Sequence, residues 1–327
     1  MRRMIHGKLT RSLGFLLAVA AGMTPVVTTA QSAVVEYSVP PGSGPHDVAP
    51  AGDGRVWFTA QRGGNLGWLN PKDGSTRLVS LGERSRPHGV IIGPDGAPWV
   101  TDGGLNAIVR VDPTTLALTV CPLPDSASGA DLNSAAFDGS GTLWFTGEAG
   151  YYGRLWPASR RVEAFNAPEG PSPYGISSCT DGMVYFVSLA ASYLGRIDTK
   201  SAQVSIVRPP SPRQGTRRVS GDADGRLWIT GWDSGNLLSY DTRTKGWHVF
   251  RLPGARPKPY AVYVDERGQV WLSDLAANAI LRFDPPSERF TSFPLPTPNA
   301  TVRELLGRPG EVWGAESATD KLVVIRE

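Results

Sequence analysis

PHGVIIGPDGAPWVTDGGLNAIVRVDPTTLALTVCPLP, residues 87–124, contains four short apolar segments separated by turn residues. Asp95-Gly96 supplies the positive φ of a tight hairpin turn, and Asp112-Pro113 turns the chain again. No helical period is long enough to compete with strands here. Four short antiparallel strands at this spacing are typical of one β-propeller blade. The predicted strands cover residues 88–92, 98–101, 107–111 and 117–121.

This unit recurs along the chain with a period of about 43 residues. A glycine stands three residues before each of seven aromatic residues, which we expect to form the core between blades: Trp57, Trp99, Trp144, Tyr185, Trp228, Trp271 and Trp313. A blade cannot bury its apolar faces alone, so the blades must stack and the ring must close. The sequence therefore predicts an all-β, seven-bladed β-propeller with four-stranded blades.

The two ends of the chain are expected to share one blade. The last repeat ends after three predicted strands, and residues 34–40, VVEYSVP, resemble the fourth strands of other repeats. We predict that this N-terminal strand completes the last blade, which removes an exposed edge.

Residues 1–30 are predicted to be a signal peptide, and residues 31–327 a single propeller domain. A basic start, an apolar stretch of eleven residues and Thr28-Thr29-Ala30 fit an export signal that is too short to span a bilayer. The remaining chain carries 29 Lys and Arg (33 minus 4) against 30 Asp and Glu. This near-neutral charge gives no electrostatic reason to expect binding to nucleic acid. We expect a secreted or periplasmic monomer without a membrane span, in which Cys121 and Cys179 either pair or stay free.

The pattern P-H-G-[VI]-x-x-G-P-D-G-x-x-W-[FV]-T-[DE], followed by x-N-x-[IL]-x-R-[VIF]-D, resembles the streptogramin lyases, the virginiamycin B lyase family. The resemblance implies a magnesium-assisted elimination that opens a cyclic depsipeptide at its ester bond. A histidine would act as general base, and Mg²⁺ held by carboxylates would stabilise the enolate. In the last two repeats, however, Tyr260 and Arg303 stand where the family has histidines, and Glu316 matches its carboxylate.

Two columns of equivalent positions are expected to ring the channel mouth. The opening column consists of the residue directly after the first residue of each repeat. The carboxylate column consists of the residue at the last position of the W-x-T-[DE] motif. The opening column is His46, His88, Asn133, Tyr174, Arg217, Tyr260 and Arg303. The carboxylate column is Ala60, Asp102, Gly147, Ser188, Gly231, Asp274 and Glu316.

His46 and His88 have the spacing of the family's histidine pair, so the same site could lie two blades further round the ring. In that hypothesis His46, His88 and Glu316 are catalytic, because an imidazole can act as a base near neutral pH. The alternative is that the two histidines only cap backbone groups.

Candidate metal ligands are Asp102, Asp274 and Glu316. Arg217 and Arg303, with Tyr174, Tyr260 and Asn133, would bind an anionic ligand. The two arginines could instead form ion pairs with Asp274 or Glu316.

Two classes of function remain open from the sequence. One is an exported carbon-oxygen lyase that opens a cyclic ester or depsipeptide in the channel. The other is a non-catalytic propeller that binds a small anionic ligand or a protein partner. A lactone hydrolase is disfavoured, because those enzymes use six blades and this chain has seven repeats. The sequence contains no GxSxG, HExxH or P-loop motif.

Overall fold

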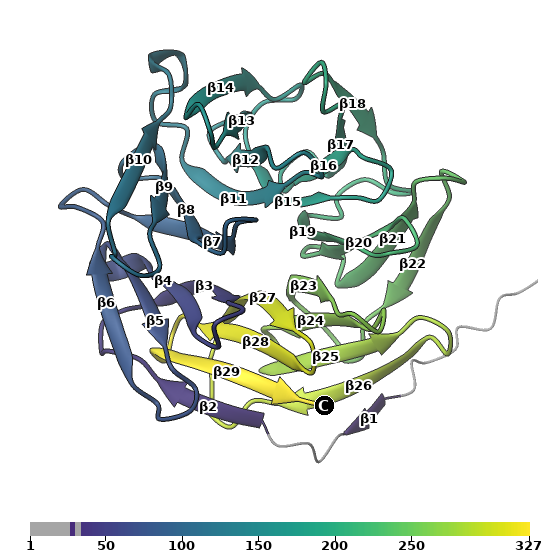
Figure 1. The fold of residues 1–327 in the computed structure, drawn as a ribbon. Helices are drawn as coiled ribbons and strands as arrows, with labels where there is room; N and C mark the ends of the chain where they lie inside the picture. Colours follow the sequence, from purple (N-terminus) through teal and green to yellow (C-terminus); the bar gives the residue numbers. More distant parts are fainter. Residues whose placement is uncertain (1–26, 30–33) are drawn as a thin grey trace, which may run out of the picture.

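Seven blades of four antiparallel strands stand around one axis in the computed structural model, which describes residues 27–29 and 34–327, and one blade carries a short fifth strand (Figure 1). The predicted fold class is confirmed. The innermost strand of each blade faces the axis, and the other strands follow outwards in chain order, except in blade 7, whose outer strand is the N-terminal β2.

The first four blades follow one another along the chain. Blade 1 contains β3 (Pro45–Pro50), β4 (Val56–Ala60), β5 (Asn65–Leu69) and β6 (Thr76–Ser80). Blade 2 contains β7 (Pro87–Ile92), β8 (Pro98–Asp102), β9 (Ala107–Val111) and β10 (Leu118–Pro122). Blade 3 contains β11 (Leu132–Phe137), β12 (Leu143–Gly147), β13 (Tyr151–Trp156) and β14 (Arg161–Asn166). Blade 4 contains β15 (Pro173–Ser178), β16 (Val184–Ser188), β17 (Tyr193–Ile197) and β18 (Val204–Val207).

The last three blades close the ring. Blade 5 contains β19 (Thr216–Gly221), β20 (Arg226–Gly231), β21 (Asn236–Asp241) and β22 (Trp247–Arg251). Blade 6 contains β23 (Pro259–Val264), β24 (Val270–Asp274), β25 (Ala279–Asp284) and β26 (Arg289–Pro294). Blade 7 contains β27 (Val302–Arg308), β28 (Glu311–Glu316), β29 (Lys321–Arg326) and β2 (Val34–Ser38). Two short 3₁₀ turns, η1 (Gln61–Gly63) and η2 (Asp125–Ala127), lie in loops.

The N-terminal strand completes blade 7, as predicted. Strand β2 pairs antiparallel with β29, from Val34 opposite Ile325 to Ser38 opposite Lys321. Its partly buried Val35 and Tyr37 pack with Trp313, so the closure buries apolar surface as well as backbone groups.

A further short strand, β1 (Val27–Thr29), pairs in parallel with β26 on the outside of blade 6. The sequence analysis assigned these residues to the predicted signal peptide. The rest of that segment, residues 1–26 and Ala30, lies outside the described residues, so export stays a prediction.

The recurring aromatic residues form the core between blades, as predicted. Trp57, Trp144, Trp271 and Trp313 are fully buried. Trp313 of blade 7 shares a cluster with Val48 and Phe58 of blade 1. Cys121 and Cys179 are free. Among the described residues, no helix is long and apolar enough to cross a lipid bilayer.

Candidate functional site

A β-bulge at the start of every innermost strand shapes the channel. In blade 1, Pro45 lies opposite Ala60 and Val48 opposite Phe58, so His46 and Asp47 together face the single residue Thr59. The same shift occurs in all seven blades. Successive side chains of a regular strand point to opposite faces, and a bulge changes that alternation. Both residues of each bulge can therefore contribute a side chain to the channel.

The threonine of the W-x-T motif holds this bulge in place. The Thr59 hydroxyl accepts the N–H of Asp47 at 3.0 Å and donates to the carbonyl of His88, in the next blade, at 2.8 Å. Thr230 does the same between Arg218 and Tyr260. These hydroxyls link the backbone of one opening residue to the bulge of the preceding blade, so they set the positions of the channel side chains.

His46 and His88 meet at the channel mouth. Their ring centroids lie 3.9 Å apart, and His46 is only 2% exposed. Nδ1 of His46 lies 2.7 Å from Oδ1 of Asp47, and Nε2 of His88 lies 3.3 Å from the amide nitrogen of Asn133. That amide also donates to Glu148 at 2.6 Å. Asn133 therefore donates towards Nε2 of His88, which places the proton of the neutral ring on Nδ1.

Both imidazoles are held in the neutral form. Burial, with the nearby positive charges of Arg218, Arg303 and Arg217, lowers the pKa of His46 well below its usual value. Burial, with the neighbouring His46 and arginines, does the same to the pKa of His88. The contact between His46 and Asp47 is thus a hydrogen bond in which neutral Nδ1–H donates to the carboxylate.

The other predicted ligand-binding residues complete the mouth. The Tyr174 and Tyr260 hydroxyls lie 2.6 Å apart, and Arg217 donates to Tyr174 at 3.0 Å. The Arg217 guanidinium lies 3.8 Å from the ring centroid of Tyr260 and 4.9 Å from that of Trp232. Among residues 27–29 and 34–327, neither Arg217 nor Arg303 forms an ion pair, so the expected alternative of pairing with Asp274 or Glu316 is not observed.

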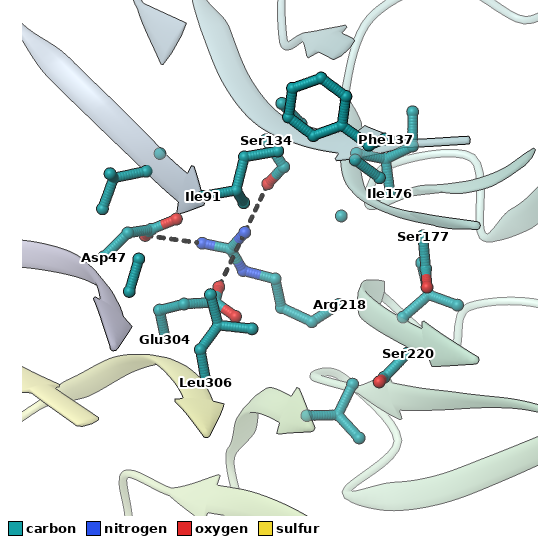
Figure 2. A pocket seen from close by; sticks show the side chains of 18 of the residues that line it. Asp47, Ile91, Ser134, Phe137, Ile176, Ser177, Arg218, Ser220, Glu304 and Leu306 are labelled. Atoms are coloured by element: carbon teal, nitrogen blue, oxygen red, sulfur yellow. Dashed lines mark hydrogen bonds and ion pairs between the residues drawn. The ribbon is translucent and has the colours of Figure 1, made fainter. Parts of the chain in front are cut away.

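A second layer of charged residues lies one position further along the innermost strands. The Arg218 guanidinium lies 3.2 Å from Asp47 and 3.0 Å from Glu304, and it donates to the Ser134 hydroxyl (Figure 2). These four residues come from blades 5, 1, 7 and 3, so their contacts span the axis. Each is at least 90% buried. Burial raises the pKa of Asp47 to about 6 and that of Glu304 to about 8, against the opposing effect of Arg218.

The sequence analysis missed this second layer. It followed only the opening column and not the next position along each strand, because a bulge cannot be predicted from strand periodicity. A signal was present: the next position is small in blades 2, 3, 4 and 6 but charged at Asp47, Arg218 and Glu304. Charged residues inside apolar strands indicate either partners in the interior or a site.

The predicted metal ligands Asp102 and Asp274 lie in different surroundings from those expected. Oδ1 of Asp102 accepts the backbone N–H groups of Arg86, Gly104 and Leu105, and its other oxygen accepts the Ser85 hydroxyl. Asp274 accepts the N–H of Lys258 at 2.8 Å in the same manner. Both carboxylates are buried and fix the loops around the entry to their blades, so their role as metal ligands stays a prediction without support from geometry.

Glu316 is fully buried, but it contacts neither histidine. Its Oε2 accepts the Thr319 hydroxyl at 2.8 Å, and its Oε1 has no hydrogen-bond partner among the described residues. Burial and the nearby Glu36 carboxylate raise the pKa of Glu316 to about 7. Glu36, which lies in β2, itself binds Lys321 and Thr297. Of the three predicted catalytic residues, the structure therefore brings His46 and His88 together, while Glu316 lies apart from them.

One group in the described part of the chain could hold a metal ion by distance: His46, Asp47 and His88, whose ligand atoms lie within 4.8 Å of one another. Mg²⁺ prefers oxygen ligands in octahedral geometry, whereas this group offers two imidazoles and one carboxylate. Oδ1 of Asp47 already binds His46 and Arg218, and three arginines raise the local positive potential. The residues do not fit Mg²⁺.

The fold and the mouth define a seven-bladed propeller whose axis carries a neutral histidine pair, unpaired arginines and a buried ionic layer. The chain belongs to the virginiamycin B lyase family, whose sequence profile matches residues 18–245. This confirms the resemblance noted from the repeat.

Curated relatives match only parts of the chain. A virginiamycin B lyase of Nocardia farcinica is 27% identical over 194 residues, which cover 58% of this chain and 63% of the relative. A gluconolactonase of Zymomonas mobilis is 35% identical over 102 residues, 30% of this chain and 27% of the relative. The chain thus spans less than two thirds of the length of the curated relatives it matches.

Solved structures share the fold over nearly the whole chain. The virginiamycin B lyase of Staphylococcus aureus has a TM-score of 0.83 at 20% identity, covering 90% of this chain and 99% of that one. A catalytically inactive variant of that enzyme, solved with quinupristin, gives the same values.

Proposed function

We propose that this protein is a lyase that opens a cyclic ester or depsipeptide in the channel mouth by elimination. The observation that carries the proposal is the neutral His46, oriented by Asp47, together with the nearby Arg217 and Arg303, which have no ion-pair partner in the described chain. A base beside unpaired cations is the combination that removal of a proton next to a carbonyl requires.

The chemistry follows from the hydrogen bonds. Because Nδ1–H of His46 donates to Asp47, the lone pair of Nε2 is the basic site. Nε2 takes the proton from the carbon next to the carbonyl, and a carbon-carbon double bond forms as the ester carbon-oxygen bond breaks. The electron pair of that bond leaves with the carboxylate.

Arginine is suited to this leaving group. A guanidinium binds a carboxylate with two parallel hydrogen bonds, so Arg217 and Arg303 would stabilise both the enolate and the product. His88 is protonated at Nδ1, and this buried N–H has no partner in the described part of the chain, so it can donate to a substrate oxygen. No step requires Mg²⁺. The relatives named virginiamycin B lyase support the reaction type, while Tyr260 and Arg303 at the family's histidine positions indicate a rearranged site.

The proposal is tested by incubating the protein with quinupristin and with macrocyclic lactones, and analysing the products by chromatography and mass spectrometry. Elimination gives a ring-opened isomer of unchanged mass, whereas hydrolysis adds one water. We expect turnover after dialysis against a chelator, and a loss of about 10²–10⁴-fold in His46→Gln. The exposed His248 on β22 supplies a matched control, His248→Gln, with unchanged turnover. Absence of turnover on every substrate, or an active His46→Gln, would overturn the proposal.

Non-catalytic binding of a small anion is the second candidate. It is favoured by the 2% exposure of His46, which restricts access to the base. In that case carboxylates would raise the thermal midpoint of the protein by mass action and Arg303→Met would remove the shift, with no product formed from any ester.

A further inference from the structure

A cavity of about 340 Å³ lies on the axis, beyond the buried ionic layer from the histidines. It is lined by the later residues of the innermost strands, including Asp47, Ala49 and Pro50 in blade 1 and Glu304, Leu306 and Gly307 in blade 7. The opening-column residues are not among its walls. This cavity is therefore distinct from the channel mouth, and its volume lies within the range of small-molecule sites.

The walls of the cavity are mostly apolar. Ile91, Phe137, Ile176 and Leu306 line it, with Ser177 and Ser220 on one side (Figure 2). An apolar wall of this kind binds the hydrocarbon part of a ligand, while a few polar groups fix its orientation.

The polar end of the cavity carries an unequal set of charges. Arg218 faces two carboxylates, Asp47 and Glu304, so one negative charge remains without a cation when both are ionised. Oε2 of Glu304 is in ion-pair range of Arg218 but makes no hydrogen bond, although Glu304 is only 8% exposed. A buried carboxylate that shares one guanidinium with a second carboxylate is costly to ionise, so an N–H donor supplied by a ligand would stabilise it.

We propose that this cavity binds a small organic ammonium ion with an apolar body, whose N–H groups donate to Glu304 and Asp47. An anionic ligand would bring a third negative group to one arginine, and a neutral one would leave the excess charge uncompensated. The alternative for the empty protein is that Glu304 takes up a proton, in agreement with its raised pKa. Binding of the ammonium ion would then displace that proton.

The experiment compares three probes of the same shape, benzylamine, benzyl alcohol and benzoate, by isothermal titration calorimetry. We expect benzylamine to bind at least tenfold more tightly than benzyl alcohol. Glu304→Gln, which keeps the shape of the side chain, should weaken benzylamine at least tenfold. Glu163→Gln, a carboxylate paired with Arg154 on blade 3, is the matched control and should have no effect.

A second variant protects the test against misfolding. Leu306→Trp fills the cavity from a half-buried position without touching the charges, and it should abolish benzylamine binding in a protein with an unchanged circular dichroism spectrum. Retained benzylamine binding in folded Leu306→Trp or Glu304→Gln would overturn the proposal. Benzoate binding that Leu306→Trp removes would also overturn it, because it would show an anion site.

Discussion

Arg218 determines the electrostatics of the axis. It contacts Asp47, Ser134 and Glu304 from three other blades, and it is 4% exposed. Two carboxylates this deeply buried depend on one guanidinium for their compensation. Removing one partner of a buried ionic group costs more than the group contributes, because charges are left unpaired.

Arg218→Met is therefore expected to lower the free energy of unfolding by about 3–5 kcal/mol in guanidinium titrations. Arg208→Met is the control, because Arg208 pairs with Glu169 on the surface and should change stability by less than about 1 kcal/mol. A loss in Arg218→Met as small as that of the control would mean that the buried layer is not a stabilising unit.

Glu304 should give the stability a measurable pH dependence. Burial raises its pKa from 4.5 to about 8, so the folded protein binds a proton that the unfolded chain releases between these values. The free energy of unfolding then falls as the pH rises towards about 8. The lowered pKa values of His46 and His88 act in the opposite direction only below about pH 7.

Wild type should thus lose stability between about pH 7, where the histidines no longer contribute, and about pH 8, and Glu304→Gln should lose much less. Denaturant titrations of the two proteins at these pH values measure the difference. Parallel curves for both proteins would show that Glu304 does not titrate in this range.

At the scale of the element, each blade repeats a bulged innermost strand, and in blades 1 and 5 a threonine on the second strand holds the bulge. The sequence predicted the strands well, because a glycine turn and a buried aromatic recur in every repeat. It could not predict the bulge, since one extra residue leaves the composition of the strand unchanged. For that reason His46 was identified and the adjacent Asp47, which orients it, was not.

Thr59→Val tests the role of the threonine. Valine keeps the shape but leaves the Asp47 N–H and the His88 carbonyl without their partner, at a cost of about 1–3 kcal/mol in unfolding free energy. Thr59→Ser keeps the hydroxyl and should recover most of the loss. Equal stability of the valine variant and wild type would contradict the proposed linkage between blades.

Asp102→Ala tests whether Asp102 stabilises a loop or binds a metal ion. The carboxylate accepts three backbone N–H groups, so its removal should destabilise the protein by about 1–3 kcal/mol whether or not Mg²⁺ is present. Thermal melts with and without Mg²⁺ give the comparison. A difference between wild type and variant that appears only with Mg²⁺ would support the metal-binding role predicted from the sequence.

At the scale of the whole molecule, the sequence predicted the closed ring of seven blades. It did not predict the buried charged layer below the channel mouth. The unfinished last repeat and the strand-like residues 34–40 predicted the closure that β2 makes with β29. Equivalent positions converge on the axis, so Tyr174, Arg217 and Tyr260 contact one another although they are far apart in sequence. The carboxylate column does not converge, because it ends the second strand, where Asp102 and Asp274 bind loop backbone and Glu316 binds the Thr319 hydroxyl.

The central claim is that the opening positions of the seven blades form one site for a carbonyl or carboxylate oxygen at the channel mouth. A crystal structure determined with bound benzoate measures this most directly. We predict that the carboxylate lies within hydrogen-bond distance of both Arg217 and Arg303, beside His46. Benzoate bound only elsewhere, or these two arginines paired with protein carboxylates, would contradict the claim.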